Sequence, residues 1–186
     1  MTRIPLTPPR TLLNRIGAWY SRRTYGKVLD PGLALGHNSR VLLSFVRLER
    51  GVARWNALDP GLKHLAAMAG AARINCSWCL DFGHWAAADG LGLPLDKIAL
   101  VPQWRQHTEA FTELEQQVMA YAEAMTETEP AVTEQLAATL LARLGEAAFV
   151  ELTAVVALEN FRSRINSAFG LTSQGFAEAC AVPARS

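Results

Sequence analysis

The chain has 186 residues, of which 50% are hydrophobic and 19% are charged. This profile is typical of a globular protein with a sizeable core and excludes a disordered chain. Because 18 basic residues nearly balance 17 acidic residues, the formal net charge is only +1. Such a balance gives no overall field that would attract nucleic acid or a membrane surface, so we expect neither partner.

The sequence contains no membrane or export signal that we recognise. No apolar run approaches the roughly 18 residues needed to cross a bilayer. The N-terminus carries arginine and three early prolines but no apolar segment followed by a cleavage site, so it does not resemble a secretion signal. We therefore expect a cytoplasmic protein, in which three cysteines indicate chemistry or metal binding rather than a disulfide framework.

The N-terminal third predicts two helices. The first covers residues 11–25 and follows a proline-rich start, and the Asp-Pro-Gly sequence at 30–32 is typical of a turn. A second helix is predicted after Asn38 or Ser39 as N-cap. It extends to Trp55, because its apolar residues recur at helical spacing.

The next two helices flank the central cysteines. Asp59 as N-cap and Pro60 at the first helical position predict a helix that runs toward Ile74. The alanine-rich residues after the cysteines predict a helix that ends at Gly90, followed by a connecting segment through about Trp104.

Clear start and stop signals continue in the C-terminal half. Thr112 with Glu115 three residues later fits a capping box, which starts a helix that runs to about Met125. Thr133 caps a helix that stops at Gly145, and a last long helix is predicted over residues 146–169.

Every segment with a clear period is helical, and no stretch shows sustained strand alternation. We therefore predict an all-α bundle of about six to eight helices, which argues against a thioredoxin fold. We expect one domain over residues 1–186. Its parts are an N-terminal arm and first helix (1–38), the helices around the cysteines (39–104), the C-terminal helices (105–170) and a loose tail (171–186).

The sequence Cys76-Ser77-Trp78-Cys79 is the strongest chemical signal in the chain. Residues three apart on a helix project from nearly the same side, so the two sulfurs can meet and pass between dithiol and disulfide. A helix N-terminus lowers the pKa of a thiol. A thiolate can attack the O–O bond of a peroxide, and the resulting sulfenic acid condenses with a neighbouring thiol.

The stretches 58–66 and 75–82 resemble the core of the carboxymuconolactone decarboxylase-like superfamily, on its alkylhydroperoxidase D-like side, and residues 160–166 resemble its final-helix pattern. The resemblance implies an all-helical homo-oligomer in which Cys79 attacks a hydroperoxide and Cys76 resolves the sulfenic acid. An external dithiol would restore the pair, and the cycle needs no flavin or metal cofactor.

The resemblance also implies a proton relay, made by a glutamate on the preceding helix and a histidine four residues after the second cysteine. Here His64 stands in the place of that glutamate and Gly83 in the place of that histidine, with His84 one position later. At about 100° per residue, His84 lies about 140° from Cys79. We therefore predict His64 as the base and keep His84 as a second candidate that reaches a cysteine only through water.

Three alternative interpretations stay open. Cys76, Cys79, His64 and His84 together offer a donor set that suits tetrahedral zinc, although their spacing matches no common zinc module. A non-enzymatic or redox-sensing helical oligomer would explain the missing relay histidine. A lactone decarboxylase would not depend on the cysteine pair.

For the remaining notable residues we expect structural roles. Trp78 and Phe82 are expected in the core, Asp81 as a solvated carboxylate, and Cys180 as a spare thiol. Five glutamates are expected to form a solvated helix face, namely Glu113, Glu115, Glu123, Glu127 and Glu129. Interhelical or intersubunit contacts are expected for Asn160, Arg162 and Arg164.

Overall fold

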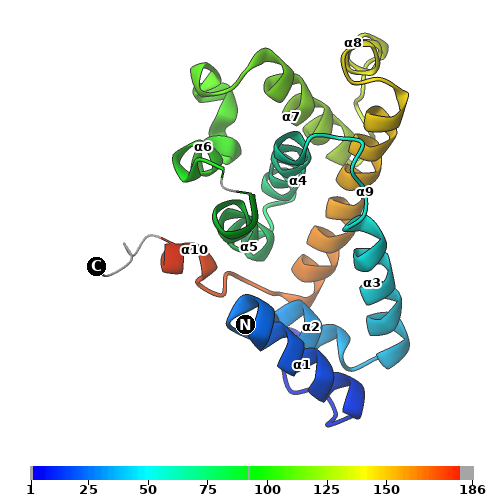
Figure 1. The fold of residues 1–186 in the computed structure, drawn as a ribbon, viewed down its shortest axis with the longest axis vertical. Coiled ribbons are helices and arrows are strands. Elements are labelled where there is room, and N and C mark those ends of the chain that lie inside the picture. Colours follow the sequence, from blue (N-terminus) through cyan, green and yellow to red (C-terminus); the bar gives the residue numbers. More distant parts are fainter. Residues whose placement is uncertain (1, 92, 181–186) are drawn as a thin grey trace. The chain divides into compact units, whose positions relative to one another are not determined.

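The computed structural model describes residues 2–91 and 93–180, with the backbone alone for residues 179 and 180 (Figure 1). Every regular element in these ranges is a helix and none is a strand, which confirms the all-α prediction. No helix in these ranges has the length and apolar character needed to span a bilayer. The α-helices are α1 (Leu12–Tyr25), α2 (Asp30–Leu35), α3 (Ser39–Val52), α4 (Pro60–Ile74), α5 (Ser77–Ala86), α6 (Leu95–Leu100), α7 (Glu113–Thr126), α8 (Glu134–Leu144), α9 (Glu146–Phe169) and α10 (Phe176–Cys180).

Most predicted helix ends lie within two residues of the observed ones, but the helix predicted to extend to Trp55 ends at Val52, and three other segments differ. The Asp-Pro-Gly sequence at 30–32 begins α2 instead of forming a plain turn, because a proline is also favoured in the first turn of a helix. After α5 the chain continues as a π-helix, η1 (Ala87–Leu91), beyond the predicted stop at Gly90. The segment predicted as a connection contains α6 and two 3₁₀ helices, η2 (Val101–Gln106) and η3 (Thr108–Ala110).

The chain divides into two compact units, and the single-domain prediction stays a prediction. The first unit comprises residues up to Trp55 together with Asn166–Leu171. Within it, Asn14 of α1 donates to the carbonyl of Gly36, and the guanidinium of Arg3 donates to the carbonyl of Ser167. The N-terminal arm therefore packs on its own unit.

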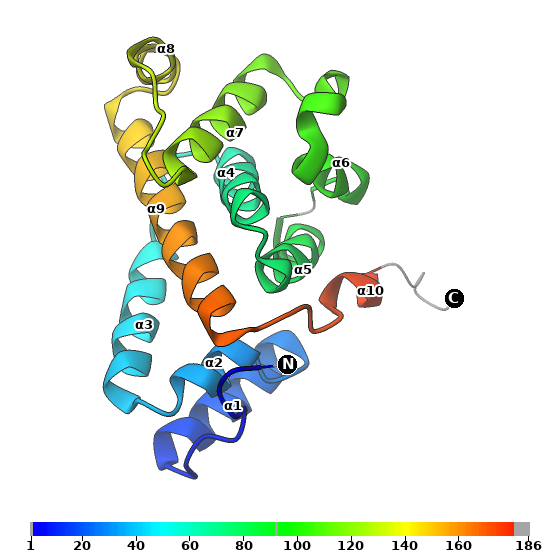
Figure 2. The same ribbon diagram turned by 180° about the vertical axis from the view of Figure 1, so that it is seen from behind.

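The second unit comprises Asn56–Ile165 and the described residues from Thr172 onward, and it contains both central cysteines. Its most extensive helix contact joins α4 to α7, and α4 also packs on α5, as Figures 1 and 2 show. Small buried residues of α4 let these helices approach closely, and large apolar residues of the neighbouring elements fill the core. The core residues include Leu65, Ala66, Met68, Ala69, Trp104, Val118, Met119, Leu140, Leu152 and Val156.

A buried carboxylate fixes the chain where it enters α4. Glu151 of α9 is only 7% exposed, accepts a hydrogen bond of 2.7 Å from the backbone N–H of Ala57 and forms an ion pair with Lys63. Burial alone would raise the pKa of Glu151, but the hydrogen bonds from Lys63 and from the backbone hold it below its ordinary value. The negative charge of Glu151 is thus compensated by Lys63 and by the backbone close to the N-terminus of α4.

The expectation of a solvated glutamate face on residues 113–129 is wrong for Glu115 and Glu123, whose half-buried carboxylates form ion pairs with Lys97 and Arg105. Glu113 and Glu127 also have cationic partners, Arg143 and Arg73, but are more exposed. Sequence periodicity places a residue on a helix face but does not say which helix covers that face, so these contacts were missed.

Candidate active site

The corner between α4 and α5 places the cysteines. Asn75 ends α4 with φ of 62°, the left-handed conformation that asparagine tolerates better than most residues. The N–H groups of Asn75 and Cys76 then bond back to the last carbonyls of α4, at 3.0 Å each, to Ala72 and Ala71 respectively. This capping turns the chain sharply, so that Cys76 becomes the N-cap of α5.

Cys76 and Cys79 form a disulfide, with their Cα atoms 5.3 Å apart. The sulfurs meet, as predicted, although Cys76 precedes the helix instead of lying on it. Its Sγ accepts a hydrogen bond of 3.3 Å from the backbone N–H of Cys79, as a serine oxygen does at an N-cap. Both cysteines are buried, and Cys79 at 8% exposed is more accessible than Cys76 at 2%.

A serine and a glutamate of α9 reach the disulfide, and the sequence analysis missed both. The Oγ of Ser163 lies 3.2 Å from the Sγ of Cys79 and 2.7 Å from Oε1 of Glu159, one helical turn away. Ser163 is fully buried and Glu159 is 6% exposed. Arg162 lies 3.5 Å from Oε2 of the same carboxylate. The chain Glu159–Ser163–Cys79 therefore joins a buried acid to a reactive sulfur.

A signal for these two residues is present in the sequence. Leu152, Val156, Glu159 and Ser163 recur at alternating spacings of four and three, and all are buried. This is the spacing of a core-facing helix stripe, so polar residues at 159 and 163 occupy apolar positions. Polar groups are buried only with partners, which makes such positions candidates for a functional site.

The two candidate histidines lie near each other and near Gly83. His64 on α4 and His84 on α5 are both half-buried. Burial lowers the pKa of His64 to about 4, an interaction with the Gly83 backbone opposes the shift, and His84 adds to it. The Nε2 atom of His64 is buried and has no hydrogen-bond partner among the described residues. His64 is therefore neutral at pH 7, and its catalytic role stays a prediction.

Gly83 and Met68 fill the space where the family pattern has a histidine. A Cβ atom placed on Gly83 would overlap the Sδ of Met68 on α4. Position 83 therefore faces α4, and the Met68 side chain occupies the space next to it. The glycine at position 83 and the buried methionine at position 68 therefore belong to one packing arrangement.

Asp81 is buried, so its expected role as a solvated carboxylate is wrong. It is 7% exposed and accepts backbone hydrogen bonds from Gln174 and Ala177 at 2.8 Å and from Phe176 at 3.1 Å. The N–H of the Trp78 indole also donates to Gln174, at 2.8 Å. These bonds fasten the segment after residue 171 to α5, so the described part of the tail is not a loose end.

Aromatic contacts reinforce the same junction. Trp78 is buried, which confirms the core prediction, and it stacks on the half-buried Phe82 with ring centroids 5.1 Å apart. Phe82 packs edge-on against Phe176 of α10 at 5.5 Å. The predicted interhelical contacts of α9 are confirmed at Asn160, which donates to Thr126 at 2.7 Å. The side chain of Cys180 lies outside the described residues.

The described residues contain no group of three or more histidine, cysteine and acidic side chains arranged to hold a metal. In the observed disulfide, both sulfurs are already bonded to each other. The geometry thus gives the zinc interpretation no support.

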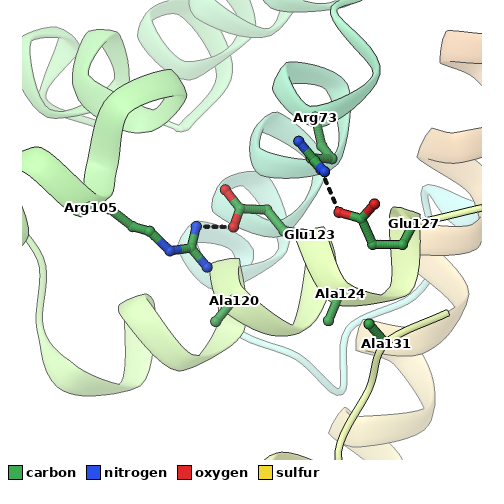
Figure 3. A pocket seen from close by; sticks show the side chains of 7 residues that line it. All are labelled: Arg73, Arg105, Ala120, Glu123, Ala124, Glu127 and Ala131. Atoms are coloured by element: carbon green, nitrogen blue, oxygen red, sulfur yellow. Dashed lines mark hydrogen bonds and ion pairs between the residues drawn. The ribbon is translucent and has the colours of Figure 1, made fainter.

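A surface pocket of about 380 Å³ lies elsewhere in the second unit, on α7 (Figure 3). Figure 3 shows Arg73 and Arg105 directed toward Glu127 and Glu123 respectively, with three alanines below the two ion pairs. Each arginine is thus neutralised by a neighbouring carboxylate. The pocket is separate from the cysteine site, and its charges are compensated within the protein.

Comparison with known sequences points to one family. The model of the carboxymuconolactone decarboxylase family matches residues 40–124. The uncharacterised protein YnjA of Escherichia coli (strain K12) is 33% identical to the chain over 176 residues, which is 92% of each protein.

Solved structures share the fold at low sequence identity. Apo debrominase Bmp8 has a TM-score of 0.78 at 18% identity, over 94% of each chain. An uncharacterised peroxidase-related protein from Silicibacter sp. TM1040 has a TM-score of 0.81 at 14% identity, over 94% of this chain and 92% of that one. The alkylhydroperoxidase AhpD core protein from Ralstonia eutropha JMP134 has a TM-score of 0.81 at 16% identity, over 98% of both chains. These likenesses establish the fold.

The Asp81 junction predicts a pH-dependent stability. Burial would raise the pKa of Asp81, but the hydrogen bonds from the backbone of Ala177, Phe176 and Gln174 hold it below its ordinary value. The ionised form is therefore favoured by folding, so its contribution is complete at neutral pH and is lost as the pH falls through the lowered pKa. We expect Asp81→Asn to lower the free energy of unfolding at pH 7 by about 1–3 kcal/mol. Urea denaturation of both proteins from pH 7 to pH 3 should show the difference shrinking with acid, and a constant difference would contradict the argument.

The contact of Gly83 with Met68 predicts a change of sign between two backgrounds. In the wild type, Gly83→Ala forces Met68 to move and should destabilise the protein by about 1 kcal/mol, because a typical overpacking cost of 1–3 kcal/mol exceeds the gain in helix propensity. In a Met68→Ala background the obstruction is absent, so Gly83→Ala should stabilise by up to about 1 kcal/mol. Thermal or urea unfolding of the four proteins measures both values. The same sign in both backgrounds would show that Met68 does not limit position 83.

Proposed function

Because the chain belongs to the carboxymuconolactone decarboxylase family and has the fold of its alkylhydroperoxidase D-like branch, we propose that it is a thiol-dependent peroxidase that reduces hydroperoxides through a Cys76/Cys79 dithiol–disulfide cycle. The observation that carries the proposal is the Cys76–Cys79 disulfide at the start of α5. This disulfide is the oxidised end of such a cycle.

Cys79 is the proposed nucleophile. Cys79 is the more exposed of the two cysteines, and its Sγ touches a buried hydroxyl. In the first step the sulfur attacks the distal oxygen of the hydroperoxide, the S–O bond forms and the O–O bond breaks. The leaving alkoxide takes up the proton that the thiol has lost, which yields one alcohol and one sulfenic acid on Cys79.

Cys76 is the proposed resolving thiol. The backbone N–H of Cys79 points at its sulfur, and such a donor stabilises a thiolate. The Cys76 thiolate attacks the Cys79 sulfenic sulfur, the S–S bond forms, and hydroxide leaves and is protonated to water. An external dithiol then reduces the disulfide by exchange. A cytoplasmic location and a homo-oligomeric state belong to the same proposal, as does the absence of a cofactor.

His64 is the proposed base on the side of α4. Its imidazole is neutral at pH 7, and Nε2 has no described partner, so a lone pair is free to take a proton. A pKa of about 4 makes it a weak base, however, because burial disfavours its protonated form. His84 lies near it and has no separate feature that favours a catalytic role.

A redox-sensing protein is the second candidate function. The observation that favours it is Gly83, which stands where the family's relay histidine is expected and where a Cβ atom would overlap the Sδ of Met68. A sensor forms the same disulfide with oxidant but does not turn over repeatedly. Steady-state turnover therefore separates the two functions.

The cysteine roles predict opposite results for two variants. Cys79→Ser should abolish consumption of tert-butyl hydroperoxide with dithiothreitol as reductant, because the nucleophile is gone. Cys76→Ser should leave a sulfenic acid on Cys79 that dimedone traps and peptide mass spectrometry locates. Cys180→Ser serves as a matched control and should keep wild-type turnover. Equal turnover by Cys79→Ser and the wild type would reject the assignment.

The histidine roles predict an order of effects. His64→Ala should lower peroxide turnover at pH 7 more than His84→Ala does, because only His64 combines a free ring nitrogen with the position of the family's relay residue. Initial rates at saturating dithiothreitol provide the comparison. The reverse order would show that His84 reaches the cysteines.

A further inference from the structure

Two buried side chains of α9 have no role in the reaction described so far. Ser163 is 0% exposed and Glu159 is 6% exposed. Removing a carboxylate from water is costly, and a protein retains one in its interior only where it is paired or used. Here Oε1 accepts a hydrogen bond from Ser163, and Arg162 lies 3.5 Å from Oε2.

The hydroxyl of Ser163 stands between the acid and the sulfur. Its Oγ is 2.7 Å from Glu159 Oε1 and 3.2 Å from Cys79 Sγ, both within hydrogen-bond reach. A hydroxyl has one proton and two lone pairs, so it can donate to Glu159 and accept from a Cys79 thiol at the same time. Once the disulfide is reduced, this geometry permits a proton to leave the thiol as another arrives at the carboxylate.

The packing of α4 keeps this arm in place. Gly70 of α4 faces it, since a Cβ atom on Gly70 would lie 3.9 Å from Glu159 Cγ and 3.5 Å from Thr126 Oγ1. Asn160 in turn donates to that threonine oxygen, at 2.7 Å. Glu159 is thus held between α4 and its own helix, with its carboxylate directed at Ser163.

We propose that Ser163 and Glu159 form the acid–base arm of Cys79, with Ser163 as a catalytic residue and Glu159 as the positioning residue and proton acceptor behind it. The thiol proton moves to Ser163 Oγ while the Ser163 proton moves to Glu159 Oε1. The sulfur attacks as a thiolate, and the proton returns along the same path to the leaving alkoxide. This arm enters from α9, whereas the residues of the family relay lie on the elements that become α4 and α5 here.

The inference rests on the proposed function for the peroxide step only, so its test uses a reaction that any reactive Cys79 performs. Reduced protein in a Cys76→Ser, Cys180→Ser background leaves one thiol. Its alkylation by iodoacetamide is followed by mass spectrometry between pH 6 and pH 8. In that reaction an S–C bond forms, iodide leaves, and the thiol proton passes to the arm.

We expect Glu159→Gln and Ser163→Ala each to slow alkylation at pH 7 by about 10²-fold, the lower range for a lost general base. The double variant should be no slower than either single variant, because the two residues act as one unit. The pH profile should also change. With the arm intact the rate varies little above pH 6, whereas without it the rate should rise about tenfold per pH unit, since hydroxide must remove the proton.

Two matched variants of the same helix control for loss of packing. Glu151→Gln removes another buried carboxylate of α9, and Thr153→Ala removes another hydroxyl, which bonds to Tyr121 at 2.9 Å. Both should alter stability and leave the alkylation rate within about twofold of the background protein. Far-UV circular dichroism verifies that each variant keeps its helices.

Three outcomes would overturn the proposal. Faster alkylation in Glu159→Gln would show that Glu159 acts on Cys79 only through its negative charge, because removing that charge makes the thiolate easier to form. Additive losses in the double variant would show two independent structural effects. A loss in His64→Ala without one in Ser163→Ala would place the base on α4. Each result is independent of peroxide turnover, so the arm and the proposed peroxidase activity can fail separately.

Discussion

The site depends on one backbone constraint, the left-handed turn at Asn75. Because Asn75 adopts φ of 62°, α4 ends in hydrogen bonds to its last carbonyls and the next residue starts a new helix. Cys76 therefore sits at an N-cap, where its sulfur meets an unused backbone N–H, and Cys79 falls in the first turn, where its sulfur meets that of Cys76. A residue that avoids the left-handed region would separate the two sulfurs without touching either.

The sequence predicts the helices because their ends carry local chemistry. Each of these ends is marked by residues that lie within a few positions of the backbone groups at that end, so a short stretch of sequence suffices to locate it. The examples are Thr112 with Glu115, Asp59 with Pro60, and Gly145. The cysteine pair is predictable for the same reason. Such local rules do not predict contacts between distant parts of the chain. The hydrogen bonds of the C-terminal segment to Asp81 are an example, because they join residues more than 90 positions apart.

Partners that come from distant elements explain the other failures of prediction. Glu159 and Ser163 appear in the sequence as polar interruptions of an apolar stripe, and only the fold shows that the stripe faces Cys79. Likewise the glutamates of residues 113–129 find arginine and lysine on α4, α6 and η2. A polar residue at a core-spaced position is thus informative, but the sequence does not name what it meets.

The residue at position 83, where the family pattern has a relay histidine, can be understood from its packing. A Cβ atom at position 83 would overlap the Sδ of Met68, so Gly83 and this methionine pack together where α5 faces α4. Burial lowers the pKa of His64 to about 4, so its imidazole is a weak proton acceptor. The sulfur of Cys79 still needs somewhere to send its proton. On α9, Ser163 touches that sulfur and Glu159 lies one helical turn behind Ser163. The contacts of Ser163 and Glu159 therefore offer the sulfur an acid–base route from α9, in addition to the neutral imidazole of His64 on α4.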